Sequence, residues 1–381
     1  MQDDSRSPLV SERRFRVNGG SKRPNTDSEI LASQHFGDYE MRKTQMALAA
    51  VALVASTAAL ADVSLYGTVD ASVVGGSGLK AQLDGSGNWA GSIYGIKGSE
   101  DLGGGMKAGF ELQAGFNAGS GGVANGGGDG VQRTWNRQSN VSVGGDFGTV
   151  KLGMQLSPFI SGSLGGYVNG NGSFYVRSLA MGSTSDGGAA AVTGYGGDAA
   201  SNVSGGFFIP NSVSYSVTAG GVSASVLGQL SNGTAANEYM AASVGTSVGD
   251  VSVGAAYQNR GGTAGYTSYN INAATTVAGL KVAGGYTNHD VVTAGTATSN
   301  TYNVGVSYPV SDALAASVQY ASSTGGKSLA NIGLQYNLSK STFAYATIAQ
   351  GTKTAVLYAG GPGSGTTGSV TGYAVGVAHS F

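Results

Sequence analysis

From Val63 to the terminal Phe381 the chain repeats short runs in which apolar and polar residues alternate. Between residues 302 and 308, for example, Tyr, Val, Val and Tyr alternate with Asn, Gly and Ser. Successive side chains of a β-strand point to opposite faces of a sheet, so each run has one apolar face and one small, polar face. Such runs over about 300 residues, behind an export signal, predict a barrel with lipid outside and water inside.

Charge is sparse throughout this alternating region. From Asp62 onward only 12 basic and 14 acidic residues stand among 320, about 8% of the segment, against ~25% in typical soluble domains. A soluble protein of this size covers its surface with Lys and Glu, so much of this exterior is expected not to meet water. Mean hydropathy near zero, with no later long apolar run, excludes a helical membrane protein. A near-neutral net charge of −1 gives no basic footprint for nucleic acid.

The segment before the alternating region has the pattern of an export signal. A basic start over residues 41–43 precedes an apolar stretch over residues 46–55, and Ala59 and Ala61 form the small-x-small pattern of a signal-peptidase site. We expect a signal peptide over residues 41–61, cleaved after Ala61. A short buried helix or a membrane anchor is the alternative.

Residues 1–40 are unlike the rest of the chain, because they are charged, mixed in composition and without period. A secretory signal begins near the N-terminus of a chain, so we interpret this segment as a spurious or disordered extension before a true start at Met41. A genuine extension ahead of the signal is the alternative. Residues 62–381 then form the barrel domain.

Sixteen segments carry the strand pattern. They span residues 63–74, 91–100, 105–117, 133–145, 148–156, 207–218, 221–230, 236–248, 251–260, 266–278, 280–289, 300–310, 313–322, 327–338, 341–350 and 370–381. Short turns alternate with long connections, which include residues 75–90, 118–132, 157–206 and 351–369. This alternation predicts a 16-stranded antiparallel transmembrane β-barrel whose last strand pairs with the first and leaves no edge. A soluble β-sandwich would need Greek-key connections and a charged outer face.

The third long loop, residues 157–206, is the longest connection. Structureless loops longer than ~15 residues are uncommon unless they have a function. We expect this loop to fold into the lumen and narrow it, and a loop outside the barrel is the alternative. Its charged residues, Arg177, Asp186 and Asp198, are candidates for the constriction or ordinary solvated charges.

Charged strand residues are expected to face the lumen, because a lipid-facing Lys at the bilayer midplane costs roughly 2–4 kcal/mol. The pore-lining candidates are Asp70, Lys97, Lys107, Glu111, Lys151 and Lys281. Arg133 and Arg137 are further candidates, although simple alternation places them on the face of Val141 and Val143. A β-bulge, or a position beyond the lipid band, would reconcile this. Aromatic residues near strand ends are expected in the interfacial girdle: Tyr66, Tyr257, Tyr286, Tyr308, Tyr336 and Phe381.

The chain lacks the residues of a catalytic or metal site. After the signal segment the histidines are His289 and His379, far apart in sequence, and cysteine is absent. Barrel lipases and proteases need a His base near a Ser or an Asp. Two separated histidines without cysteine cannot build a metal constellation. We therefore expect no enzyme activity, no metal and no cofactor.

Six motifs spread along the chain carry a resemblance to a known family. They are Asp62-Val-Ser-Leu-Tyr-Gly-Thr-Val-Asp70, Gly95-Ile-Lys-Gly-Ser-Glu-Asp-Leu-Gly-Gly-Gly105, Asn136-Arg-Gln138, Phe147-Gly-Thr-Val-Lys-Leu-Gly153, Asn211-Ser-Val-Ser-Tyr215 and Val375-Gly-Val-Ala-His-Ser-Phe381. Together they resemble motifs of the general porins of Gram-negative beta-proteobacteria. The resemblance implies a homotrimer of sixteen-stranded barrels in the cell outer membrane, in contact with lipid and lipopolysaccharide. It also implies an inward third loop and passive diffusion of small solutes and ions.

The resemblance carries two further expectations. Phe381 would end the strand that the barrel-assembly machinery recognises. Family members often have arginine where this chain has Ile93 and Met154, and another just before the Asn-Ser-Val motif, at residues 207–210 here. A ring of basic side chains selects anions, so its depletion predicts weak ion selectivity. A β-barrel surface or adhesion protein that binds partners through its long loops is the alternative function.

Overall fold

The computed structural model describes residues 61–77, 79–122, 134–168, 207–230, 238–261, 265–291, 299–324, 327–352 and 369–381. The strands are β1 Ala61–Gly76, β2 Leu79–Asp84, β3 Ile93–Gly103, β4 Met106–Gly115, β5 Gln138–Gly145, β6 Gly148–Leu156, β7 Phe208–Ala219, β8 Val222–Gln229, β9 Tyr239–Val248, β10 Val251–Arg260, β11 Tyr266–Val277, β12 Leu280–Val291, β13 Ser299–Pro309, β14 Leu314–Ser323, β15 Lys327–Asn337, β16 Thr342–Thr352 and β17 Val370–Ser380. Helix α2, Pro158–Ser163, is followed by a 3-10 turn η1, Leu164–Gly166. No helix in these ranges is long and apolar enough to cross a membrane.

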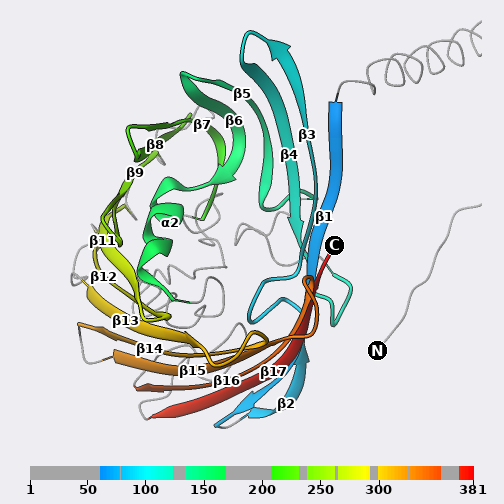
Figure 1. Cartoon of the computed structure of the whole chain (residues 1–381), viewed down its shortest axis with the longest axis vertical. Helices are drawn as coiled ribbons and strands as arrows, with labels where there is room; N and C mark the ends of the chain where they lie inside the picture. The colour runs from blue at the N-terminus through cyan, green and yellow to red at the C-terminus, as the bar shows by residue number, and fades with distance from the viewer. Residues whose placement is uncertain are drawn as a thin grey trace, which may run out of the picture. The chain divides into compact units, whose positions relative to one another are not determined.

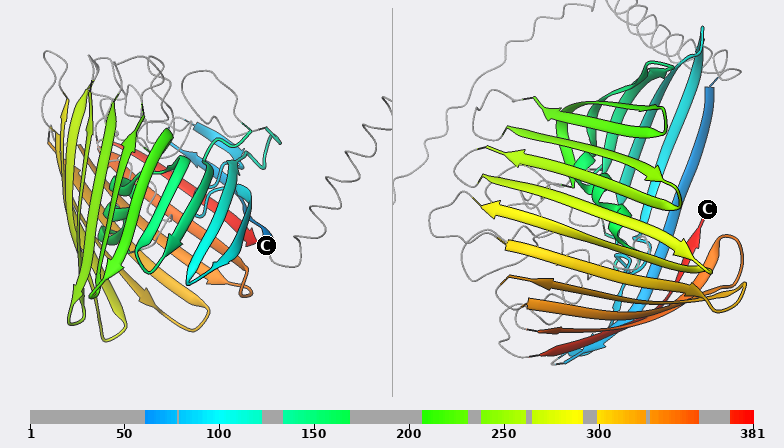
Figure 2. Two further views of the ribbon diagram at one scale, coloured as in Figure 1. Left: turned by 90° about the horizontal axis from the view of Figure 1, so that it is seen from above. Right: turned by 60° about the vertical axis from the view of Figure 1, so that its left-hand side comes forward.

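The strands form one closed antiparallel sheet (Figures 1 and 2). Strands adjacent in sequence pair from β3 to β17, and β17 pairs with β1 along residues 68–76. On its other edge, β1 pairs with β3 over residues 61–68 and with β2 over residues 72–76. Because β2 and β3 share one position in the wall, the strand segments form a sixteen-stranded barrel. The predicted barrel is confirmed.

The tight turns fit the right-handed twist of the strands they join. Ala219 of β7 pairs with Val222 of β8 across a two-residue turn, in which Gly220 and Gly221 have φ of 58° and 79°. A two-residue turn with both φ values positive matches strand twist, and glycine adopts it without steric penalty. The predicted strands 207–218 and 221–230 had implied a short connection here.

β2 is the main difference from the predicted strands. Residues 75–90 were expected to form a loop, but β2 lies within them. It pairs with residues 72–76 of β1, with a register shift between Val74 and Gly76. β2 is only six residues long and follows several glycines, so its alternation was too short to predict it as a strand. β5 also differs, because it begins at Gln138 and not near residue 133.

The two faces of the barrel wall differ in chemistry. In β1 the side chains of Val63, Leu65, Val69 and Val73 are 37–65% exposed, whereas Asp70 between them is buried. Cross-strand partners share a face, so the register of the closed sheet extends the apolar face and the polar face around the barrel. The exposed apolar face is the outer, lipid-facing one and the polar face is the inner one.

Candidate functional site

The first part of the long third loop forms a short helix. Ser157 precedes α2 and its Oγ accepts a hydrogen bond from the Phe159 N–H at 3.1 Å, while Pro158 occupies the first turn. A serine cap followed by proline is a standard helix start, because the cap satisfies a free N–H and proline lacks one. α2 lies within the ring of strands in Figure 1 and contacts β8 to β11, whereas η1 contacts β10 to β12.

Two asparagines of the inner wall hold this segment. Asn272 Nδ2 donates to the Gly162 carbonyl at 2.9 Å, and Asn303 Nδ2 donates to the Gly166 carbonyl at 2.7 Å. The start of the loop therefore lies against the inner wall. Residues 169–206, which carry most of the predicted constriction, lie outside the described residues.

A chain of buried hydrogen bonds continues from the helix cap along the wall. The hydroxyls of Ser157 and Tyr239 lie 2.6 Å apart, and Tyr239 donates to Gln258 Oε1 at 2.8 Å. Gln258 Nε2 donates to Ser268 Oγ at 3.2 Å, and that oxygen lies 2.6 Å from His289 Nδ1. The Tyr239 proton is used toward Gln258, so Ser157 donates to Tyr239. The cap of α2 is thus tied to four consecutive strands, β9 to β12.

Tyr239→Phe is expected to destabilise the folded protein by about 1–3 kcal/mol, because it leaves buried polar atoms of Ser157 and Gln258 without that hydroxyl. Tyr257→Phe, one strand away on the outer face, is the matched control and is expected to change stability by less than about 0.5 kcal/mol. Denaturant unfolding of both variants in vesicles measures the difference. Equal effects would show that the hydrogen-bond chain contributes nothing.

Three predicted pore residues meet on the inner face of β3 to β5. Lys97 and Glu111 are cross-strand neighbours, and the Lys97 ammonium lies 5.1 Å from the centre of the Tyr66 ring. Tyr66 donates to Glu111 Oε1 at 2.5 Å and accepts from Gln113 Nε2 at 2.9 Å. Arg137 Nε in turn donates to Gln113 Oε1 at 2.7 Å.

This cluster corrects two expectations. Tyr66 faces the lumen and not the lipid, so its assignment to the aromatic girdle was wrong. The parity problem of Arg137 disappears because β5 begins only at Gln138, and alternation does not extend back to the arginine. Its guanidinium reaches the inner-face Gln113 and also lies 4.7 Å from the centre of the Phe208 ring.

Three lysines stand on the inner face near the tight turns. Lys107 is opposite Asp101 and Gly144, Lys151 is opposite Ser142 and Ser214, and Lys281 is opposite Thr276 and Ser307. Within the described residues none of the three ammonium groups has a hydrogen-bond or ion-pair partner. Each is therefore available to ions in the lumen.

The remaining predicted site residues are a buried aspartate, two residues at the ends of the barrel domain, and residues outside the described ranges. Asp70 is on the inner face but 0% exposed, because residues 85–92 cover it, so it does not line open water as expected. Ala61 is the first residue of β1, and the backbone of Phe381 pairs with Gly67. Outside the described residues lie Ala59, Arg133, Arg177, Asp186 and Asp198.

Sequence reasoning missed two features of the inner wall. Arg260 is 3% exposed, shares the face of Gln258 and pairs with Tyr239 and Tyr266. Arg260 is the last residue of the predicted strand 251–260, and the alternation that places Gln258 inside places Arg260 there as well. The second feature is the inward course of residues 85–92, for which a lone Trp89 among Gly, Ser and Asn was the available signal.

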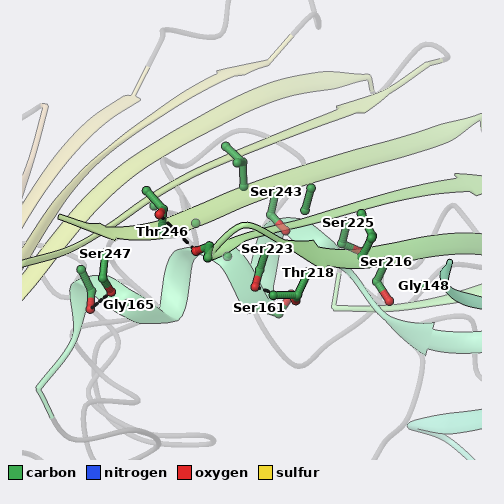
Figure 3. A pocket seen from close by; sticks show the side chains of 18 of the residues that line it. Gly148, Ser161, Gly165, Ser216, Thr218, Ser223, Ser225, Ser243, Thr246 and Ser247 are labelled. Carbon is green, nitrogen blue, oxygen red and sulfur yellow. Dashed lines mark hydrogen bonds between the residues drawn. The ribbon is translucent and has the colours of Figure 1, made fainter. Parts of the chain in front are cut away.

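A cavity of about 950 Å³ lies between α2 and the inner wall on the turn side (Figure 3). Small polar side chains dominate its lining, among them Thr149, Ser161, Ser216, Ser225, Ser243 and Ser252. Asp146 is the one charged residue among those that the structure places around it. No group of three or more His, Cys, Asp or Glu in the described ranges could hold a metal ion. The space is therefore hydroxyl-lined and suited to water.

A closed barrel with an apolar outside and a polar, hollow inside defines the class of outer-membrane β-barrel proteins. Residues 47–355 match the model of the Gram-negative porin family, and the chain belongs to this family. The predicted family and the outer-membrane location are confirmed.

Two outer-membrane proteins are similar to part of this chain in sequence. A segment is 38% identical over 122 residues to outer membrane porin protein 32 of Delftia acidovorans, and 38% over 127 residues to the major outer membrane protein P.IB of Neisseria gonorrhoeae. Each match covers 31% of this chain and 33% of the relative, so it spans about a third of those relatives' length.

Solved structures of outer-membrane proteins superpose over most of the chain. The anion-selective porin from Comamonas acidovorans is 25% identical, with a TM-score of 0.63 over 84% of this chain and 100% of that one. The trimer form of OmpT from Vibrio cholerae is 14% identical, with a TM-score of 0.61 over 84% and 100%. The second likeness shows the fold alone.

Proposed function

We propose that this chain forms a water-filled channel through which small hydrophilic solutes and ions diffuse passively across the outer membrane. The observation that carries the proposal is the two-faced wall, with exposed apolar side chains outside and a hydroxyl-lined cavity inside. No chemistry on the solute is needed, so the chain acts as a channel and not as an enzyme.

The proposal extends to parts of the chain beyond the described residues. The loop over residues 157–206 narrows the lumen, Arg177, Asp186 and Asp198 take part in the constriction, and Arg133 lines the pore. The attachment of residues 157–168 to the inner wall supports this course. Residues 41–61 are removed on export.

The same proposal covers the partners. The chain assembles as a homotrimer through the barrel-assembly machinery and sits among outer-membrane lipid and lipopolysaccharide. Membership of the family and the likeness to the trimer form of OmpT support the trimer.

Planar-bilayer recording tests the channel directly. Protein purified from outer membranes of a porin-deficient host is expected to give stepwise, ohmic current increments, and extract from the same host without the gene is the control. Intact folded protein that gives no increments would contradict the proposal and favour the surface-protein alternative.

Lys151→Gln is expected to shift the zero-current potential in a salt gradient toward cation preference. The reason is that the variant removes one inner-face positive charge, and the shift should shrink at high salt as the charge is screened. Lys340→Gln, at an exposed position in the turn after β15, is the control and should leave the potential unchanged. We expect the parent channel to be weakly selective. Equal shifts in zero-current potential for the two variants would show that Lys151 does not line the pore.

A further inference from the structure

The chain leaves the barrel wall between β2 and β3 and enters the interior. Residues 85–92, here called the strap, carry Trp89 onto the inner face of β15 and β16. The indole Nε1 donates to Gln335 Oε1 at 2.9 Å, and its ring centre lies 5.2 Å from that of Tyr345. The indole packs directly on the backbone of Gly333, because a Cβ at that position would lie 2.8 Å from it.

A fully buried carboxylate anchors the strap. Asp70 Oδ2 accepts the backbone N–H groups of Trp89 at 2.8 Å and Ala90 at 2.7 Å, while Oδ1 accepts the Tyr345 hydroxyl at 2.6 Å. Ser92 Oγ accepts from the Asp70 N–H at 3.0 Å and donates to the Asp70 carbonyl at 2.9 Å. A buried carboxylate is tolerated only when such charge-assisted bonds replace its water, so these contacts fix both partners.

Two further strap side chains bond to the wall. Asn88 Nδ2 donates to Asp84 Oδ2 at 2.9 Å and to Ser72 Oγ at 2.7 Å. Ser86 donates to Asp84 Oδ1 through its backbone N–H at 2.9 Å and its hydroxyl at 2.6 Å. The strap is therefore held by two carboxylates, on β1 and β2, and by the Gln335 amide on β15.

The strap and the third loop cover different parts of the inner wall. Residues 157–168 lie on β8 to β12, whereas the strap lies on β1, β15 and β16. The strap continues directly into β3, and its Ser92 and Gly85 carbonyls accept the N–H groups of Phe116 and Ala118, just beyond β4, at 3.0 and 2.8 Å. Lys97, Lys107 and Glu111 face inward farther along β3 and β4.

We propose that the strap is a permanent second narrowing element of the lumen, that Asp70 is its positioning residue, and that it directs passing solutes to the charged wall of β3 to β5. This inference rests on the proposed channel function. The strap contributes volume and not charge, because Asp70 and Asp84 are buried beneath it.

Fluorescence tests the anchor independently of channel activity. The chain has two tryptophans, Trp89 and Trp135, so a Trp135→Phe background isolates the strap. In folded protein, adding Asp70→Asn is expected to shift the Trp89 emission to longer wavelength and to increase its quenching by acrylamide. Thr287→Val, which disturbs another buried inner-wall bond on β12, is the control and should change neither signal.

Conductance tests the narrowing. Asp70→Asn is expected to raise the single-channel conductance and its open-state noise. Trp89→Ala, which keeps both backbone bonds to the carboxylate, is expected to raise conductance without added noise. If Asp70→Asn fails to fold, Tyr345→Phe replaces it. This variant removes one of the three donors to the Asp70 carboxylate, and it is expected to raise conductance and noise by a smaller amount.

Two results would overturn the inference: unchanged Trp89 emission and quenching in folded Asp70→Asn, or an accessible Trp89 with unchanged conductance. If the parent protein forms no channel, the proposed function fails and the narrowing role fails with it. The fluorescence response would still decide whether Asp70 positions the strap.

Discussion

Val226→Arg is expected to destabilise the folded barrel in lipid by about 2–4 kcal/mol, whereas Ser225→Arg is expected to cost far less. Val226 is 52% exposed on the outer face of β8, where it pairs with Tyr215 and Ala242. An arginine there places a guanidinium in hydrocarbon. Ser225 lines the inner cavity, so the same side chain one residue away reaches water.

Val226 and Ser225 are neighbours on the same strand, and both are replaced by arginine. A difference in stability between the two variants therefore reports which face of the wall the side chain is on. Denaturant unfolding of both variants in vesicles gives the two stability losses, and Ser225→Arg should in addition shift the zero-current potential toward anions. Equal losses, or a larger loss for Ser225→Arg, would mean that the faces are assigned the wrong way round. A large loss for both in detergent, without lipid, would point to disturbed strand packing and not to the bilayer.

The alternation of side chains made most of this fold predictable. Period two is a local property, so β6 and β10 could be placed to the residue from sequence alone. β2 could not, because its pairing with β1 depends on a register shift next to two glycines. The start of β5 was misjudged for a related reason. Trp135 and Asn136 look like strand residues but precede the ladder, in which the first described β5 residue to pair is Gln138.

The same rule placed side chains on a face but could not tell what covers them. Lys97 and Glu111 were assigned to the inner face from parity, and the register agrees. Asp70 obeys the same parity yet is buried, because the strap that covers it comes from a loop whose path depends on tertiary contacts. Tyr66 shows the converse case. A tyrosine near a strand end fits the interfacial girdle, but Tyr66 has the same parity as Asp70, and its bonds to Glu111 and Gln113 place it on the inner wall.

Deletion of Phe381 is expected to abolish most assembly into the outer membrane in cells while lowering the stability of refolded protein only modestly. The residue closes the seam between the two ends of the barrel. Its N–H donates to the Gly67 carbonyl at 3.0 Å, and its carbonyl accepts from the Gly67 N–H at 3.1 Å. Two such bonds contribute about 1–3 kcal/mol together, too little to unfold a barrel of this size.

A larger loss in cells would point to recognition of the last strand during assembly. The Phe381 ring supports that role, since it lies over Gly67 at the outer face and is 54% exposed, where a partner can reach it. Phe381→Tyr keeps the aromatic ring and should assemble like the parent, whereas Phe381→Ala should fail with the deletion. The amount of folded, heat-modifiable protein in purified outer membranes, set against the yield of refolding in detergent, measures the two effects separately. Equal reductions in cells and in detergent would show that Phe381 only stabilises the pairing of the first and last strands and is not an assembly signal.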